Sequence, residues 1–216
     1  MLLGLLKKKE CWCLTWRGWT VLLLMFILGT IAIIKLTFPF LAVTDPVKAD
    51  VLVLEAWLPD FCLQDVKSRF KQDGYKMLIL TGGAIPRGEP FAEFKTYPEM
   101  MRAVLLKQGW DEGQVVAIPG TSEKTYRTFT SALALKEWLS RRDPAFSSIN
   151  IYSLGPHARR TRATFQRVLG DHVKVGVIAG EDPRCDKDNW WRTSVGTSTV
   201  IYQSLAYFYW FLFPNP

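Results

Sequence analysis

Residues 51–83 read VLVLEAWLPDFCLQDVKSRFKQDGYKMLILTGG, and the order of their parts decides the fold class. The stretch opens and closes with short uncharged runs, Val51–Leu54 and Met77–Leu80, which are typical of strands buried on both faces. Between them, the charged stretch Asp60–Gln72 is expected to be a helix. A strand, a helix and a second strand in this order predict two parallel strands joined by a right-handed crossover.

The same alternation continues along the rest of the chain. Three further strands are expected at Val115–Ile118, Ile149–Ser153 and Val173–Ile178, and three further helices at Tyr97–Gln108, Glu123–Ser140 and His157–Leu169. The pattern predicts an α/β domain, doubly wound, with a mostly parallel five-stranded sheet and helices on both faces. Thr125 and Thr128 open the apolar stripe of their helix, so both should point towards the carboxyl edge of the sheet.

The residues before this domain predict a membrane anchor. Trp19–Ile34 is free of charge, Lys35 interrupts the run, and apolar residues then continue to Val43. With the lysine snorkelling towards the head groups, residues 18–43 can cross a hydrocarbon core of about 30 Å. The alternatives are a cleaved signal peptide, for which the small-residue cleavage site is missing, and a buried core helix, for which no polar face is visible.

Basic residues on the two flanks predict the orientation of that anchor. The N-terminal side carries the lysine cluster Lys7–Lys9 and Arg17, whereas the other side offers Lys35 and Lys48. The positive-inside rule therefore places residues 1–17 in the cytoplasm and residues 44–216 outside the cytoplasmic (inner) membrane. Because much of the net charge of +7 belongs to these flanks, it does not indicate a nucleic-acid partner.

The C-terminal run Val200–Phe213 is the second apolar segment of the chain. It is short for a membrane span, so we expect a helix packed on the domain, with its aromatic end dipping into the membrane surface. A second span is the alternative.

Polar and basic residues follow three of the expected strands, at the edge of a parallel sheet where ligands bind. Glu55 follows the first strand, Thr81-Gly82-Gly83 the second, and His157, Arg159 and Arg160 follow the fourth. Helix dipoles disfavour cations at a helix start, so the arginines call for an explanation. The sequence favours an anionic ligand, phosphate or carboxylate, over the alternative of a solvated helix face.

Three of these residues have both a structural and a functional interpretation. Glu55 is either an ion-pairing residue or a catalytic base or hydroxyl acceptor, and His157 is either a structural histidine or a catalytic acid or base. Glu99 fits a capping box with Thr96, and ligand binding is the alternative.

The sequence lacks the usual cofactor and metal motifs. Gly83–Gly88 has the glycine spacing of a phosphate-binding loop, but Glu89-Pro90 stands where lysine and a hydroxyl residue belong. No metal site is expected, and the cofactor is left unknown. Cys62 and Cys185 should both lie at the carboxyl edge, where they either form a disulfide or remain two separate thiols.

Several of these features together resemble the YdcF/SanA/ElyC family of bacterial α/β domains over roughly residues 48–180. The resemblance rests on the N-terminal anchor, the Thr81-Gly82-Gly83 turn, the Thr125-Tyr126 helix start and the Gly155–Arg160 turn. The Ser-Gly-Gly of the family matches Thr81-Gly82-Gly83, and its late histidine and arginine match His157 and Arg160. Its glycine-rich first loop is replaced here by Glu55-Ala56-Trp57.

The resemblance implies a Rossmann-like fold and an extracytoplasmic domain with a role in cell-envelope integrity or surface-polymer synthesis. It implies a phosphate-bearing or nucleotide-like small molecule as the ligand, and membrane proteins of envelope synthesis as partners. The resemblance carries no settled reaction, and an enzyme acting on a lipid- or nucleotide-linked precursor is one hypothesis. The alternative is a non-catalytic regulatory or structural partner of an envelope membrane complex.

Overall fold

The computed structural model describes residues 12–86, 93–121, 126–142 and 146–213. The chain divides into two compact units, and the boundary along the sequence lies between Leu36 and Thr37. The first unit holds most of helix α1 (Trp16–Leu41), whose side chains are almost all exposed. Within the described ranges, α1 is the one helix that is long and apolar enough to cross a membrane, which confirms the predicted apolar helix; its role as an anchor stays a prediction.

The second unit is built around a five-stranded parallel sheet with the strand order β3-β2-β1-β4-β5. Its strands are β1 (Val51–Glu55), β2 (Met77–Gly82), β3 (Val115–Pro119), β4 (Ser148–Leu154) and β5 (Lys174–Gly180). All pairings among these strands are parallel, which confirms the predicted doubly wound α/β class.

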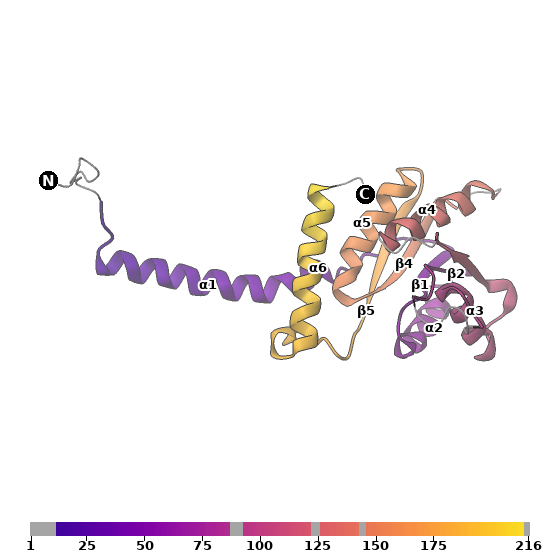
Figure 1. The fold of residues 1–216 in the computed structure, drawn as a ribbon, viewed down its shortest axis with the longest axis horizontal. Coiled ribbons are helices and arrows are strands. Elements are labelled where there is room, and N and C mark those ends of the chain that lie inside the picture. Colours follow the sequence, from indigo (N-terminus) through magenta and orange to yellow (C-terminus); the bar gives the residue numbers. More distant parts are fainter. Residues whose placement is uncertain (1–11, 87–92, 122–125, 143–145, 214–216) are drawn as a thin grey trace. The chain divides into compact units, whose positions relative to one another are not determined.

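Helices cover both faces of the sheet, as Figure 1 shows. Helices α2 (Leu63–Gln72) and α3 (Tyr97–Lys107) cover one face, and α4 (Arg127–Ser140) and α5 (Ala158–Leu169) cover the other. Successive side chains of a strand point to opposite faces of the sheet, so every second residue of a strand packs against the same pair of helices. In β1, Leu52 and Leu54 pack towards α2 and α3, whereas Val51 and Val53 pack towards α4 and α5.

The strand order creates a switch point between β1 and β4. The chain runs outwards from β1 to β2 and β3, and then returns to add β4 on the other side of β1. The connections that leave the carboxyl ends of β1 and β4 therefore diverge. In open α/β sheets, the crevice left at such a point is where ligands bind.

The predicted elements differ from the observed ones mainly at their ends. The first expected helix begins as a short 3-10 helix, Asp60–Cys62, before α2, and the His157–Leu169 helix is likewise preceded by the 3-10 turn Gly155–His157. The C-terminal helix α6 (Ser194–Leu212) starts before the expected Val200, because Thr193 caps it by accepting a hydrogen bond from the Gly196 amide.

Helix α6 packs on the domain, against α5 and against the 3-10 turn Gly155–His157 that precedes α5. Trp190, in a 3-10 helix just before α6, is buried. The prediction of a C-terminal helix packed on the domain is therefore confirmed. Its contact with a membrane surface remains a prediction.

Candidate functional site

Three neighbouring strands each place a polar residue at the same level of the sheet. Glu55 of β1 pairs in register with Thr81 of β2, and the register of β1 with β4 brings Ser153 beside Glu55 on the other side. All three lie on the face of the sheet that α4 and α5 cover, because each follows by two residues an apolar side chain that packs there: Val53, Ile79 and Ile151. Each of the three polar residues is at most 3% exposed. The apolar layer under α4 and α5 therefore ends in a buried polar row at the switch point.

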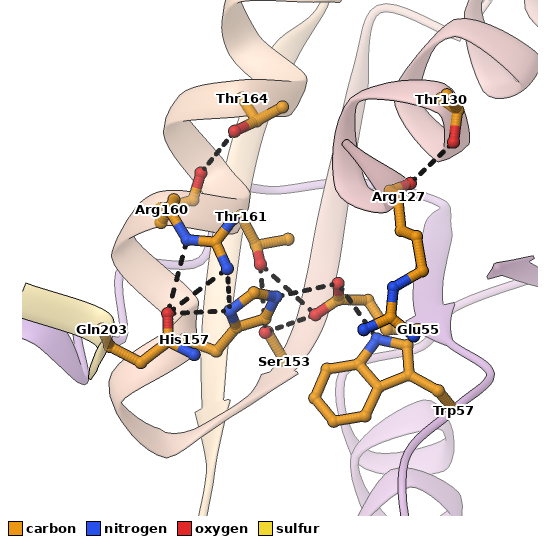
Figure 2. Close-up of polar contacts among 10 residues, drawn as sticks. All are labelled: Glu55, Trp57, Arg127, Thr130, Ser153, His157, Arg160, Thr161, Thr164 and Gln203. Atoms are coloured by element: carbon orange, nitrogen blue, oxygen red, sulfur yellow. Dashed lines mark hydrogen bonds and ion pairs between the residues drawn. The ribbon is translucent and has the colours of Figure 1, made fainter. Parts of the chain in front are cut away.

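Glu55 uses its hydrogen-bonding capacity within the protein (Figure 2). Its Oε2 accepts from Ser153 Oγ at 2.5 Å and from Thr161 Oγ1 at 3.3 Å. Its Oε1 lies 3.3 Å from His157 Nε2 and accepts from Trp57 Nε1 at 3.4 Å. An ionised carboxylate offers about four acceptor positions, so the four contacts fill them.

These partners keep Glu55 ionised in spite of its burial. Burial acts to raise the pKa of Glu55, but the charge and hydrogen bond of His157, the Ser153 hydroxyl and the charge of Arg160 together outweigh it and lower the pKa below its ordinary value. A buried negative charge thus lies at the base of the site. The compensation comes from Ser153 on β4, His157 in the turn before α5 and Arg160 on α5.

His157 contacts three residues through its two ring nitrogens. Its Nδ1 lies 3.0 Å from Arg160 Nη2 and 3.2 Å from Gln203 Oε1. Its Nε2 lies 3.3 Å from Glu55 Oε1, so the imidazole bridges the carboxylate and the guanidinium. The indole of Trp57 meets the imidazole edge-on at 5.5 Å, which closes one side of the ring.

Arg160 is held between α5 and α6. Its Nε and Nη2 each donate to Gln203 Oε1 at 3.3 Å, while Nη2 also reaches His157 (Figure 2). Burial lowers the pKa of Arg160, and the neighbouring charge of Glu55 opposes that effect. The chain of contacts from Glu55 through His157 to Arg160 orients the guanidinium. Its remaining N–H groups have no partner within the described part of the chain.

These residues line one cavity of about 930 Å³. Its polar end is formed by Glu55, Thr81–Gly83, Thr128, His157 and Arg160. Two further arginines line it: Arg127, which points down from the start of α4 in Figure 2, and Arg167 of α5. The rest of the wall is mostly aromatic or aliphatic, with Ser131, Thr164 and Gln203 as its polar members, and about half of it comes from α6 and the Phe213 that follows.

Thr81 is the one cavity-lining residue with an unsatisfied buried hydroxyl. Its side chain is fully buried, and its Oγ1 has no hydrogen-bond partner among the described residues. Buried hydroxyls are rarely left without a partner, so this atom points to a missing acceptor or donor. The two glycines beside it differ in role: a Cβ on Gly82 would crowd Pro98 at 3.3 Å, whereas a Cβ on Gly83 would meet nothing within 4 Å.

The structure brings together most of the residues singled out from the sequence. The Thr81–Gly83 turn and the His157–Arg160 turn face the same cavity, as expected from their places after β2 and β4. Glu55 and Thr128 line it as well. Thr125 lies outside the described residues.

Two predicted ligand-binding residues lie elsewhere. Glu99 closes a capping box with Thr96 at the start of α3 and borders a separate hollow of about 510 Å³. Arg159 donates to the Phe40 carbonyl, and its guanidinium lies over the Phe40 ring. One residue along a helix turns a side chain by about 100°, so Arg159 and Arg160 cannot face the same way.

Five residues of the site were not selected from the sequence: Ser153, Thr161, Gln203, Arg127 and Arg167. Ser153 carried a usable signal, because it is a polar residue that ends an apolar strand just as Glu55 and Thr81 do. Gln203 carried another, as the polar amide in the apolar run of α6. The other three were hidden within polar helix faces.

Cys62 and Cys185 are free thiols, each 2% exposed. Burial raises the pKa of each thiol to about 11, with the charge of Asp182 adding to the effect. The structure therefore has the two separate thiols rather than the disulfide. Within the described ranges there is also no cluster of side chains that could hold a metal ion.

No protein-family model matches this chain, and no curated protein is significantly similar to it.

Proposed function

We propose that this chain is a membrane-anchored protein that binds an anionic, phosphate-bearing small molecule in the cavity at the switch point. The charge of the lining carries the proposal. Arg127, Arg160 and Arg167 line the cavity, and Glu55 is the one carboxylate among its described lining residues. Because four contacts already fill the acceptor positions of Glu55, it leaves Arg127 and the remaining N–H groups of Arg160 to an anion.

Two further features support an oxyanion as the ligand. The Thr81 hydroxyl is buried without a partner beside the turn of Gly82 and Gly83, so a ligand oxygen there would satisfy it. The start of α4, where backbone N–H groups favour anions, contributes Arg127 and Thr128 to the same cavity. The family resemblance agrees with a phosphate-bearing or nucleotide-like molecule.

The contacts of Glu55 and His157 favour binding over catalysis. Both ring nitrogens of His157 are engaged, Nε2 with Glu55 and Nδ1 with Arg160 and Gln203. Acid or base catalysis by His157 would require Nδ1 to exchange Arg160 for a ligand atom. In our proposal, Glu55 and His157 are positioning residues that orient Arg160. An enzyme acting on a phosphate-bearing envelope precursor is the alternative, and it requires His157→Gln to abolish turnover while binding persists.

The experiment is a titration of the full chain in lipid nanodiscs with inorganic pyrophosphate, using empty discs as the blank. Arg160→Gln removes the charged hydrogen bonds to the ligand, which are worth about 1.5–3 kcal/mol each. We expect the dissociation constant to rise by about 10- to 100-fold. Arg141→Gln is the matched control, because Arg141 is an exposed residue that pairs with Glu137 on the surface. Equal binding by wild type and Arg160→Gln would refute the proposal.

We also propose that the anchor keeps its N-terminus in the cytoplasm and the α/β domain outside the inner membrane. The support is the excess of lysine and arginine before α1, together with one candidate span within the described residues. The resemblance adds a role in cell-envelope or surface-polymer biogenesis, in contact with membrane proteins of that process. A reporter fused after Pro216 should behave as extracytoplasmic. Cytoplasmic behaviour of the reporter would overturn the orientation.

A further inference from the structure

The cavity has a second half with different chemistry from the arginine-lined end. Helix α6 carries no charged residue along its whole length. It lines the cavity with residues that recur every three or four positions, the spacing of one helix face: Tyr202, Gln203, Leu205, Ala206, Tyr209 and Trp210, followed by Phe213. The cavity therefore joins a cationic end to an apolar, aromatic one.

We infer that the ligand is an amphiphile, with its anionic head group at Arg160 and a hydrocarbon chain lying along α6. The inference rests on the proposed anion site and names the class of molecule that occupies it. It selects a lipid-linked phosphate over a nucleotide.

A nucleotide fits the α6 half poorly, because most of the polar and stacking groups there, Tyr202 excepted, are already engaged. The Gln203 amide oxygen accepts from Arg160, and Tyr209 shares a hydrogen bond with Tyr126 that raises the Tyr209 pKa. The Trp210 ring stacks on Tyr207 at 5.7 Å, and the Arg167 guanidinium lies 3.6 Å from its centroid. A base or sugar would find few free donors, acceptors or ring faces. A hydrocarbon chain needs none of them.

The apolar half is also open to its surroundings. Leu205, Tyr209 and Phe213 line the cavity and are nevertheless more than half exposed. Ile201 and Phe208 of α6 lie outside the cavity and are exposed as well. A helix that shows apolar side chains both inside a cavity and on its outer surface is typical of a segment that lies in a membrane interface.

The last residues of α1, which belong to the same compact unit as α6, contact that helix. Phe38 and Leu41, at the end of α1, are buried in the α/β domain. Phe40 meets the Tyr207 ring of α6 edge-on at 5.7 Å. The residues through which the chain enters the α/β domain therefore contact the same helix that lines the apolar half of the cavity.

The experiment measures binding of butyl, hexyl and octyl phosphate to the full chain in nanodiscs, with empty discs as the blank. Burying one methylene strengthens binding by up to about fourfold, so wild-type affinity should rise steadily from butyl to octyl phosphate. Ala206→Trp fills the apolar half, and Leu205→Gln makes it polar. Both should flatten the dependence on chain length and leave inorganic pyrophosphate binding unchanged. Phe208→Trp, on the same helix but outside the cavity, should keep the wild-type dependence.

The outcomes separate this inference from the anion site itself. If pyrophosphate binds to wild type but both α6 variants keep the wild-type chain-length dependence, the hydrocarbon chain of the ligand does not lie on α6. The inference then fails, while the proposed anion site stands. Tighter binding of uridine monophosphate than of octyl phosphate would overturn it in favour of a nucleotide. If Ala206→Trp also loses pyrophosphate binding, its chain-length data cannot be used, and the result for Leu205→Gln, a change at an exposed residue, decides whether the hydrocarbon chain lies on α6. Failure of wild type to bind any phosphate would refute the proposed function instead.

Discussion

Replacing Glu55 with glutamine tests whether a buried, ionised carboxylate organises the site. In the folded protein, Glu55 is 3% exposed and has well-formed contacts with Ser153, Thr161 and His157. A hydrogen bond to a charged group is worth about 1.5–3 kcal/mol, and one to a neutral group about 0.5–1.5 kcal/mol. Losing roughly 1 kcal/mol at each of three contacts lowers the free energy of unfolding by about 3 kcal/mol at neutral pH.

The loss should depend on pH in a defined direction. The pKa of Glu55 is lower in the folded protein than its ordinary value of 4.5, because its partners outweigh its burial. A lowered folded-state pKa stabilises the protein fully above the unfolded-state value, and this stabilisation is lost as the pH falls through the folded-state pKa. The difference in stability between wild type and Glu55→Gln should therefore be largest near pH 7 and shrink as the pH falls below about 4.5.

Urea unfolding of the full chain in nanodiscs, followed by circular dichroism at a series of pH values, measures this difference. Glu137→Gln is the control, since Glu137 forms an exposed pair with Arg141 on the surface of α4 and should cost less than about 1 kcal/mol. Two results would refute the reasoning: equal stability of wild type and Glu55→Gln at pH 7, or a difference that stays constant down to pH 3. Either one means that Glu55 is not an ionised acceptor in the folded protein.

Three other predictions concern the stability of the domain and its thiols. Asn150→Ala removes the buried amide that both accepts from and donates to the Val47 backbone, and should lower the free energy of unfolding by about 2–3 kcal/mol in the same urea assay. Gly176→Ala should cost about 1–3 kcal/mol, because its Cβ would overlap the Asn150 side chain and the Val47 nitrogen; a neutral effect would contradict this packing. Cys62 and Cys185 should resist a thiol reagent in the native protein, and both should react after denaturation without reductant. If both stay unreactive after denaturation, the two cysteines form a disulfide and the prediction is wrong.

The sequence by itself determined the elements of the fold, because their signals are local. Runs such as VLVL and MLIL are apolar over the length of a buried strand, and each polar helix between them offers one apolar stripe. The alternation of these elements left a parallel, doubly wound sheet as the consistent arrangement. The composition of α1 likewise predicted a candidate span before any tertiary contact was known.

Part of the site was also readable, since its residues follow directly from the ends of strands. Glu55, Thr81 and His157 stand just after or at the last residues of β1, β2 and β4, and parallel strands bring their carboxyl ends to one edge. For Glu99, by contrast, the sequence left two roles open, a helix cap and a ligand-binding residue. The capping geometry in the structure shows the cap.

Only the tertiary structure decided which of the polar residues meet. The strand order places β1 between β2 and β4, and so seats Glu55 between Thr81 and Ser153; no local pattern specifies that neighbourhood. The packing of α6 brings Gln203 onto Arg160 across 43 residues of sequence. Local sequence sets which residues form a helix or a strand, whereas contacts between distant residues depend on how the elements pack together, which is a property of the whole chain.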